Sequence, residues 1–487
     1  MHIVFAASEC VPFAQTGGLA KVIGELPPEL VELGHSVTVY LPLYKSARAL
    51  LPETLTYAVR SITIPFQYYN RFAGIVDGGL RDGVQYYFVD CPELFDREGI
   101  YGPKDGAGDY GDNAERFGLY CRAILEATKQ LGIPDIFHMH DWAAGMLPVL
   151  LRSTYYFDVA LKSAGVVLTI HNAAYQGWFP PKTIEQMLLP WDMFTPDKLE
   201  HYDKLNFLKG GLVYSDYLTT VSPTYAKEIQ TEEFGARLDS VLRRRSGDLR
   251  GILNGVDYAA WDPAHDGKLA AHYSAENLDG KAECRKDLLH AYGLGNVPET
   301  TAVIGIVSRL ATQKGFDFLM EIANQLDERD AVLVVLGTGE PYYEQFFRSW
   351  AARRPHQVSV QVRYDETLAH KVEAGSDIYL APSRYEPCGL NQLYSLKYGT
   401  VPVVRATGGL EDTVEEWNGE ARTGTGFKFY GYNPQDLLGA IDRALGAFRD
   451  KDGWQALMRN GMAKDFSWKK PAAEYVEVYE EVLRRRG

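Results

Sequence analysis

The sequence predicts an α/β protein built from two Rossmann-like, doubly wound domains in tandem. Short runs rich in β-branched residues recur along the chain, and each is followed by a loop and then by helical periodicity. This rhythm is typical of the buried strands of parallel sheets. The series of strands begins again after residue 300, and 487 residues are too many for one compact core. Two large domains therefore explain both the repeated alternation of strands and helices and the length of the chain.

The expected elements follow the same order in both halves of the chain. The first series of strands covers residues 3–5, 37–39, 136–137 and 166–170, and the second covers 303–307, 332–336, 378–380 and 401–404. Gly, Asn and Pro punctuate the stretch between the two series, which suits a hinge. We therefore expect a first domain over 1–252 and a second over 253–487. Apolar residues at helical spacing predict a final amphipathic helix over 470–486, and the sequence leaves open which domain it packs on.

The composition excludes several classes of protein. The formal net charge of −14 argues against nucleic-acid binding, which needs a dense basic face. The five cysteines include no Cys-x-x-Cys pair, so neither a disulfide framework nor a zinc site is indicated. No stretch approaches the roughly 18 apolar residues of a membrane helix, and no basic residue precedes the first apolar run. We expect a cytoplasmic protein that binds neither membranes nor nucleic acid.

Two glycine loops are candidates for anion binding. The segment 16–19 and the segment 407–410 both read Thr-Gly-Gly-Leu, and each follows a strand and opens a helix. Glycine lets backbone N–H groups come close to a phosphate at the positive end of a helix. The alternative is a tight turn between strand and helix. Because ligands of doubly wound sheets bind outside the carboxyl ends of the strands, two copies at such positions favour function.

Two cations follow the strand 303–307 in the segment Ser-Arg-Leu-Ala-Thr-Gln-Lys-Gly. Arg309 and Lys314 are expected to emerge together at the end of that strand. Each cation contributes about 4 kcal/mol of Coulomb energy at 4 Å from a diphosphate in an effective dielectric of 20. The spacing thus favours a diphosphate clamp, and two unrelated surface cations are the alternative.

A carboxylate and several histidines also follow strands. Glu386 lies between Tyr and Pro in the segment 382–390, where it could stabilise positive charge at an anomeric carbon or merely begin a helix. His171 ends the strand 166–170, where a donor could reach a sugar hydroxyl. His138 and His140 share one face of a strand, but no third metal ligand is evident nearby.

Taken together, the motifs resemble those of the glycogen and starch synthases of glycosyltransferase family 5 over nearly the whole chain. The segments that carry the resemblance are Gln-Thr-Gly-Gly-Leu at 15–19, His-Asp-Trp at 140–142, Thr-Ile-His-Asn at 169–172, Leu-Asn-Gly-Val-Asp at 253–257, Ser-Arg at 308–309 with Gln-Lys-Gly at 313–315, Glu-Pro-Cys-Gly-Leu at 386–390 and Thr-Gly-Gly-Leu at 407–410. The resemblance implies the GT-B fold, in which two Rossmann-like domains face a deep cleft. It also implies transfer of glucose from ADP-glucose to the 4-hydroxyl of an α-1,4-glucan, with retention and with no metal or cofactor.

The resemblance further implies roles for single residues. Arg309 and Lys314 would hold the diphosphate, Glu386 would support the reacting glucosyl unit, His171 would orient it and Asn254 would touch the sugar. Asp141 would line the pocket near the donor sugar and the acceptor, and Tyr364 would stack on the adenine. The remaining donor-binding positions implied are Gln15, Gly17, Gly18, Cys388, Gly389, Leu390, Thr407, Gly408 and Gly409, with the two glycine loops offering backbone N–H groups to phosphate and sugar.

Two positions depart from the family pattern. Gln15 stands where the family usually has Lys, and Lys21 stands where Asp is common. Glutamine brings no charge to a phosphate, so the choice between ADP-glucose and UDP-glucose stays open. A glucan phosphorylase-like enzyme with pyridoxal phosphate on a lysine and a non-catalytic glucan-binding protein are the alternative functions. The oligomeric state also stays open.

Overall fold

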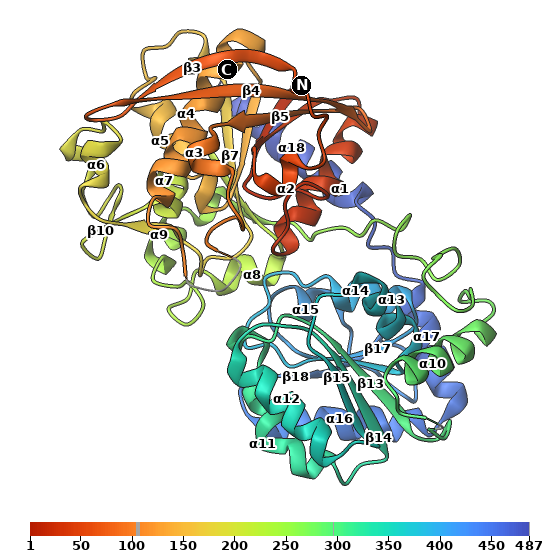
Figure 1. The fold of residues 1–487 in the computed structure, drawn as a ribbon. Coiled ribbons are helices and arrows are strands. Elements are labelled where there is room, and N and C mark those ends of the chain that lie inside the picture. The colour runs from red at the N-terminus through yellow and green to blue at the C-terminus, as the bar shows by residue number, and fades with distance from the viewer. Residues whose placement is uncertain (104–107, 296, 487) are drawn as a thin grey trace. The chain divides into compact units, whose positions relative to one another are not determined.

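The computed structural model describes residues 1–103, 108–295 and 297–486, and the chain divides into two compact units (Figure 1). Unit 1 comprises Met1–Val221, Ala226–Gly255 and the chain from Trp468 onward. Unit 2 comprises Val256–Ser467 together with the short segment Ser222–Tyr225. Each unit is built on its own sheet, which is wholly parallel in unit 2 and parallel except at one edge in unit 1.

The domain boundary expected after residue 252 is corrected to lie between Gly255 and Val256. The side chain of Ile252 is buried in the core of unit 1, and its N–H donates to the carbonyl of Thr220 there, at 2.8 Å. The N–H of Val256 instead donates to the carbonyl of Phe466 in unit 2, also at 2.8 Å. The chain therefore passes from unit 1 to unit 2 at the point where its backbone hydrogen bonds change from one unit to the other.

The expected second domain also ends earlier than residue 487. Helix α18 (Lys469–Arg486) packs in unit 1, where Tyr475, Tyr479 and Val482 are fully buried in the same core as the first strand. Trp468, just before the helix, is buried too, and its indole N–H donates to Glu25 at 2.8 Å. The apolar stripe read from the sequence thus belongs to the first core, because that core supplies the matching apolar face.

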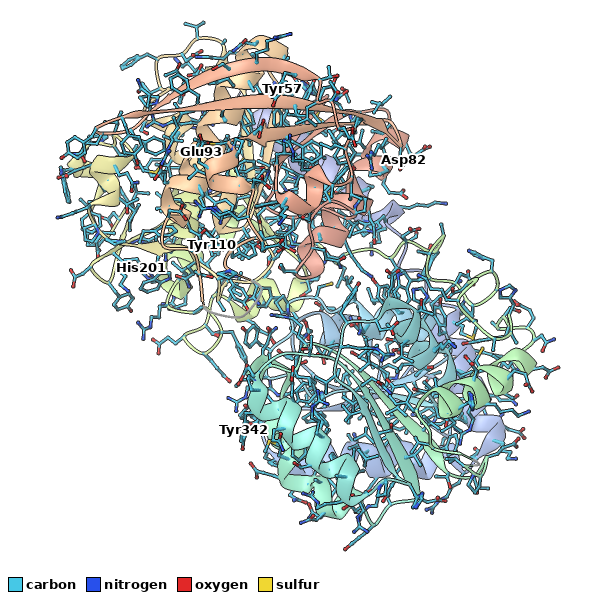
Figure 2. The ribbon with its side chains drawn as sticks, viewed as in Figure 1. Tyr57, Asp82, Glu93, Tyr110, His201 and Tyr342 are labelled. Atoms are coloured by element: carbon cyan, nitrogen blue, oxygen red, sulfur yellow. The ribbon has the colours of Figure 1, made fainter. Side chains whose placement is uncertain are left out.

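The sheet of unit 1 has nine strands in the order β12-β11-β7-β6-β1-β2-β5-β4-β3. The strands predicted from the sequence are β1 (His2–Ala6), β2 (Ser36–Pro42), β6 (Ile136–His140) and β7 (Gly165–Ile170). The strands not predicted are β3 (Tyr57–Pro65), β4 (Asn70–Arg81), β5 (Val84–Asp90), β11 (Tyr217–Thr220) and β12 (Leu249–Gly251). β3 and β4 pair antiparallel at one edge, where Tyr57 of β3 lies (Figure 2). Its hydroxyl donates to Asp90 at 2.6 Å. Three short strands form a separate small sheet: β8 (Trp178–Phe179), β9 (Glu200–His201) and β10 (Lys204–Asn206).

The sheet of unit 2 has six parallel strands in the order β15-β14-β13-β16-β17-β18. Numbered from the first strand of the unit, this is the order 3-2-1-4-5-6 of a doubly wound dinucleotide-binding sheet. The strands are β13 (Ala302–Val307), β14 (Ala331–Leu336), β15 (Val358–Gln361), β16 (Ile378–Ala381), β17 (Val401–Arg405) and β18 (Phe427–Phe429). The sequence predicted four of them and missed the edge strands β15 and β18.

Helices cover both faces of each sheet. Ile304 and Ile306 of β13 pack on one side with α11, α12 and α16, whereas Val303 of the same strand packs on the other side with α10 and α13. The helices of unit 1 besides α18 are α1 (Gly18–Glu32), α2 (Lys45–Arg48), α3 (Pro92–Phe95), α4 (Asn113–Leu131), α5 (Met146–Arg152), α6 (Thr183–Gln186), α7 (Phe207–Tyr214) and α9 (Asp239–Arg244). Those of unit 2 are α10 (Asp279–Ala291), α11 (Phe316–Leu326), α12 (Pro341–Arg353), α13 (Glu366–Gly375), α14 (Asn391–Lys397), α15 (Gly408–Thr413), α16 (Pro434–Phe448) and α17 (Lys451–Met462). Helix α8 (Pro223–Glu228) spans a change of unit.

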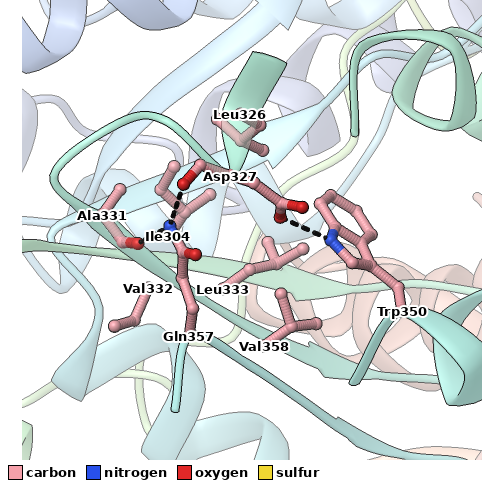
Figure 3. Close-up of a pocket in the computed structure, with 9 residues that line it drawn as sticks. All are labelled: Ile304, Leu326, Asp327, Ala331, Val332, Leu333, Trp350, Gln357 and Val358. Atoms are coloured by element: carbon pink, nitrogen blue, oxygen red, sulfur yellow. Dashed lines mark hydrogen bonds between the residues drawn. The ribbon is translucent and has the colours of Figure 1, made fainter. Parts of the chain in front are cut away.

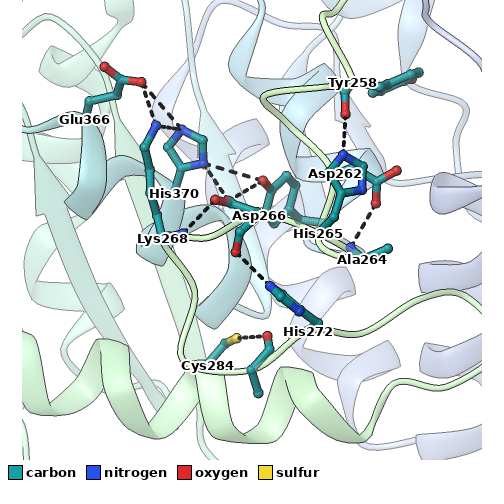
Figure 4. Close-up of polar contacts among 12 residues, drawn as sticks. Tyr258, Asp262, Ala264, His265, Asp266, Lys268, His272, Cys284, Glu366 and His370 are labelled. Carbon is teal, nitrogen blue, oxygen red and sulfur yellow. Dashed lines mark hydrogen bonds and ion pairs between the residues drawn. The ribbon is translucent and has the colours of Figure 1, made fainter.

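A buried polar network fastens the segment that enters unit 2 to its helices (Figure 4). One carboxylate oxygen of Asp266 lies 2.6 Å from Nδ1 of His370 and accepts the Tyr398 hydroxyl, also at 2.6 Å. The ring of Trp261 stacks on His370 at 3.7 Å and on Tyr394 at 3.8 Å. Because every partner is supplied from within unit 2, this network is a structural anchor.

Within the described ranges, no helix has both the length and the apolar composition that a bilayer crossing requires.

Candidate functional site

Several residues expected to carry function follow the strands at which the order of each sheet reverses. In unit 1, β2, β5, β4 and β3 lie on one side of β1, and β6, β7, β11 and β12 lie on the other. In unit 2, β13 is flanked by β14 and β16 in the same way. A crevice forms at such a point because the loops after the two central strands turn to opposite sides of the sheet. Each unit therefore has one favoured ligand position.

In unit 2 the loops after β13 and β16 bring a lysine and a glutamate into contact. Nζ of Lys314 donates to Oε2 of Glu386 at 2.5 Å, and the Ser383 hydroxyl donates to the same oxygen at 3.0 Å. The two charged side chains are 20% and 11% exposed. Two such bonds to one oxygen hold the carboxylate in one orientation. Ser383 is a member of this site that the sequence analysis did not single out.

Glycine allows these two loops to approach. Gly315, directly after Lys314, has φ +72°, and a Cβ there would lie 1.9 Å from the carbonyl oxygen of Pro382. Gly408 has φ +46°, and its Cβ would lie 1.9 Å from the carbonyl oxygen of Glu386. Both positions combine a left-handed backbone with contact too close for a side chain, so glycine is required on two counts. The pairing of Lys314 with Glu386 depends on these close approaches.

The backbone of the second glycine loop is bonded to the segment that carries Glu386. We expected Gly408 and Gly409 to offer backbone N–H groups to a ligand. The N–H of Gly409 instead donates to the carbonyl oxygens of Glu386 and Pro387, at 3.1 and 3.2 Å. A Cβ at Gly409 would also lie 2.0 Å from the carbonyl oxygen of Cys388. The loop therefore supports the backbone that carries Glu386, because its donor is already bonded to that backbone.

The other expected residues of unit 2 surround this pair to different extents. Arg309 is exposed, and its side chain forms no hydrogen bond or ion pair with the described residues, although its carbonyl accepts from Ala311 and Ser308. Tyr364, just before α13, is 74% exposed. Cys388 and Thr407 are buried, and Gly389 has φ +73°. Leu390 directly precedes α14, whose first residue Asn391 donates its amide to the carbonyl of Val307 at the end of β13, at 2.6 Å.

In unit 1 the first glycine loop is bonded to a carboxylate that the sequence analysis overlooked. Oε2 of Glu9 accepts the backbone N–H groups of Thr16 and Gly17, at 2.6 and 3.1 Å. Oε1 accepts the hydroxyls of Thr16 and Tyr101, at 2.7 and 2.8 Å. In this structure the N–H of Gly17 is thus bonded to Glu9, and the expectation that it is offered to a phosphate stays a prediction. The chain's own carboxylate lies at the positive end of α1, where an anion was expected.

Gln15 and Gly18 flank these bonds and are both exposed, so their side-chain and backbone groups remain accessible. Asn254 is 6% exposed, and its Oδ1 has no hydrogen-bond partner in the described chain. A buried amide oxygen without a partner is unusual and indicates a position that a donor group can satisfy. These three positions are expected sites that the structure leaves open.

Asp141 adopts a strained backbone directly after β6. Its φ of +56° and ψ of −170° belong to a region that is populated almost only by glycine and that costs about 1–3 kcal/mol for other residues. Its Oδ1 accepts the backbone N–H of His171 at 2.7 Å. Burial, with a smaller contribution from the nearby charge of Glu9, raises the pKa of Asp141 to about 7. Strain and a shifted pKa at the same residue are typical of a functional site.

His171 is held by both Asp141 and His140, because its backbone N–H donates to Asp141 and its side chain contacts His140. Nε2 of His171 lies 2.9 Å from Nδ1 of His140. Burial lowers the pKa of His171 to about 3 and that of His140 well below its usual range. Both imidazoles are therefore neutral near pH 7 and act through hydrogen bonds. Contact between these two histidines could not be predicted from the sequence, which shows only that both lie at strand ends.

His138 lies beside His140, and their ring centroids are 4.2 Å apart. Its Nδ1 lies 2.8 Å from the hydroxyl of Tyr479 in α18, and its Nε2 lies 2.6 Å from the hydroxyl of Thr169. Both ring nitrogens are thus engaged with protein groups. This side chain ties the last helix to the sheet.

A separate small pocket in unit 2 lies at the opposite end of the strands (Figure 3). Its lining includes Ala331 and Val358, which begin β14 and β15, and the indole N–H of Trp350 donates to Asp327 there at 2.8 Å. Lys314 and Glu386 follow the carboxyl ends of their strands. Because ligands of doubly wound sheets bind at the carboxyl ends, this pocket is not the candidate site.

The chain matches known protein families and structures along its length. Residues 2–244 match the model of the starch synthase catalytic domain, and residues 295–447 match that of glycosyl transferases group 1. It is 55% identical to a glycogen synthase of Koribacter versatilis over 100% of this chain and 99% of the relative. It is 41% identical to a glycogen synthase of Bacillus cereus over 99% of this chain and 100% of the relative.

Solved structures agree with this similarity. The catalytic domain of Starch Synthase IV from Arabidopsis thaliana, bound to ADP and acarbose, superimposes with a TM-score of 0.89 at 31% identity, over 99% of each chain. A sucrose-phosphate synthase from Thermosynechococcus elongatus has a TM-score of 0.63 at 17% identity, over 99% of each chain, and thus shares the fold. The two Rossmann-like units are therefore those of the GT-B fold. By sequence, motif and structure, the chain belongs to the glycogen and starch synthase family of glycosyltransferases.

Proposed function

We propose that this chain transfers glucose from ADP-glucose to the 4-hydroxyl at the non-reducing end of an α-1,4-glucan, with retention at the anomeric carbon. Family membership and the glycogen synthase relatives support the reaction class. The ADP bound to the similar plant starch synthase supports the nucleotide, and the acarbose supports a glucan acceptor. The similarities favour neither a phosphorylase-like enzyme nor a non-catalytic binding protein.

The contact between Lys314 and Glu386 is the observation that carries this proposal. A lysine and a glutamate in contact at a strand-order reversal suit a reaction in which a diphosphate leaves while positive charge develops on a sugar. Lys314, with the exposed Arg309, neutralises the leaving diphosphate, and Glu386 stabilises the glucosyl unit as its bond to the diphosphate breaks. The hydrogen bond from Ser383 keeps Glu386 oriented when the diphosphate competes for Lys314.

The residues of unit 1 act on the sugar in this proposal. His171 donates a hydrogen bond to a hydroxyl of the transferred glucose, and Asn254 uses its unpartnered Oδ1 to accept one. Asp141 lines the position of the donor sugar and the acceptor. Tyr364 of unit 2 stacks on the adenine, which its high exposure allows. Gln15 contacts the donor without adding charge.

Incorporation of labelled glucose into glycogen from ADP-glucose tests the proposal directly. Lys314→Ala should lower kcat by at least about 100-fold, because one cation near a diphosphate contributes about 4 kcal/mol before desolvation. Lys286→Ala is the matched control, because Lys286 forms an exposed ion pair with Glu283 at 2.7 Å on the surface of the same unit. Near-normal incorporation by Lys314→Ala, or none by the unchanged protein, would contradict the proposal.

The donor nucleotide needs a comparison of its own. Initial rates with ADP-glucose and UDP-glucose on one glucan primer should favour ADP-glucose. Gln15→Lys should lower the KM for the preferred donor, because it adds a cation at an exposed position next to α1. Equal rates with both donors would show that the base is not recognised.

A further inference from the structure

The fully buried His140 has no part in the reaction as proposed above, yet it contacts His171. Its side chain is 0% exposed, and its ring stacks on Phe5 with an interplanar angle of 18°. Nδ1 of His140 lies 2.9 Å from Nε2 of His171. The other nitrogen of His140, Nε2, is buried and has no hydrogen-bond partner in the described chain.

Two arrangements of protons are compatible with this geometry, since one of the two facing nitrogens must donate. If His171 donates from Nε2, the neutral His140 carries its proton on Nε2, and a buried N–H group is left without an acceptor. If His140 donates from Nδ1, only a lone pair is left unpartnered at its Nε2. Orphaned N–H groups are the rarer of the two in folded proteins. The ring of Phe5 does not relieve the first arrangement, because it lies parallel to the imidazole and away from its edge.

We propose that His140 is a positioning residue that fixes the tautomer of His171 by donating from Nδ1 to Nε2 of that residue. Neutral His171 then carries its own proton on Nδ1. His171 is half-buried, and its Nδ1 bonds to no described residue, so this N–H is available to a ligand. This inference deepens the proposed function, on which it rests, by specifying how His171 comes to be a donor to the sugar.

The surroundings keep the two imidazoles in this arrangement. Asp141, the neighbour of His140, accepts the backbone N–H of His171, so that both the main chain and the side chain of His171 are held from the end of β6. β6 and β7 pair directly, with His140 opposite Thr169. His138 lies beside His140 but is bonded to Tyr479 and Thr169, so it stabilises the sheet without contacting His171 through a hydrogen bond.

Nitrogen NMR of the histidine side chains tests the tautomer without any substrate. The full chain labelled with ¹⁵N only in its 11 histidines gives signals that distinguish protonated from unprotonated ring nitrogens. The signals that disappear in His171→Gln belong to His171. They should show Nδ1 protonated and Nε2 unprotonated. A proton on Nε2 of His171 in the unchanged protein would overturn the inference.

Substitutions of His140 test the consequence for catalysis. His140→Phe keeps an aromatic ring and removes the donor, so kcat should fall roughly 10-fold or more and Nε2 of His171 should gain a proton. His140→Asn places an amide N–H near the position of Nδ1 and should restore the tautomer and most of the rate. His138→Phe, the matched control, removes an equally buried histidine and should leave the tautomer of His171 unchanged.

The two readouts separate the inference from the proposed function. If the unchanged protein transfers no glucose from ADP-glucose, the proposed function fails, and the NMR result still decides how His171 is protonated. If the protein is active but His140→Phe leaves the tautomer of His171 as it was, the inference fails and the proposed function stands. If His140→Phe changes the tautomer and His140→Asn restores it, the inference is upheld.

Discussion

Glu9 is predicted to hold the first glycine loop, and its removal should loosen that loop in a measurable way. The side chain is 3% exposed and accepts four hydrogen bonds, two of them from the backbone of Thr16 and Gly17. Glu9→Ala removes all four acceptors. Hydrogen bonds to a charged group contribute about 1.5–3 kcal/mol each, but Thr16 is exposed and water can reach its amide. We therefore expect a loss of about 2–4 kcal/mol in the stability of unit 1.

Glu9→Gln should be much milder for a geometric reason. The glutamine oxygen can take the place of Oε2 and accept both backbone N–H groups. Its amide nitrogen then faces the hydroxyls of Thr16 and Tyr101, which can rotate and accept. Tyr101 can donate instead to Ser8, whose hydroxyl oxygen lies 2.7 Å away. Only the charge is lost, which costs about 1–2 kcal/mol.

Urea unfolding followed by tryptophan fluorescence measures these changes, and amide hydrogen exchange localises them to residues 15–19. Glu53→Ala is the control, because Glu53 is an exposed carboxylate of the same unit, and it should change stability by less than about 0.5 kcal/mol. Exchange in residues 15–19 should speed up strongly in Glu9→Ala and slightly in Glu9→Gln. The reasoning is refuted if Glu9→Ala behaves like the control, or if Glu9→Gln is as damaging as Glu9→Ala.

Three further predictions concern other contacts. Gly408→Ala should lower kcat and cost about 1–3 kcal/mol, because its Cβ would lie 1.9 Å from the carbonyl oxygen of Glu386; unchanged kcat and urea midpoint would contradict this. Asp141→Asn should remove a pH dependence of stability: burial raises the pKa of Asp141 to about 7, so its stabilising contribution is full below about pH 4 and is lost as pH rises to 7. Parallel stability curves over that range would disprove it. Tyr479→Phe should cost about 1–3 kcal/mol in urea unfolding, since Nδ1 of His138 loses its buried partner.

Much of the fold could be predicted from the sequence because its signals are local. A buried parallel strand needs a short apolar run, and a helix on its face needs apolar residues at helical spacing, so both are visible within a few residues. The strand ends also predicted where Lys314, Glu386, Asp141 and His171 lie. Edge strands such as β15 escaped prediction because they are only partly buried and lack a strong apolar run.

The sequence by itself thus determined the two sheets, the family and the chemical groups placed at the strand ends. The tertiary structure alone decided which of those groups touch. Lys314 meets Glu386 across 72 positions of chain, and His140 meets His171 across 31, because the order of strands in each sheet brings their loops together. It also decided that Glu9 occupies the loop expected to bind an anion. Such contacts depend on strand order and on close backbone approach, which no local pattern of residues specifies.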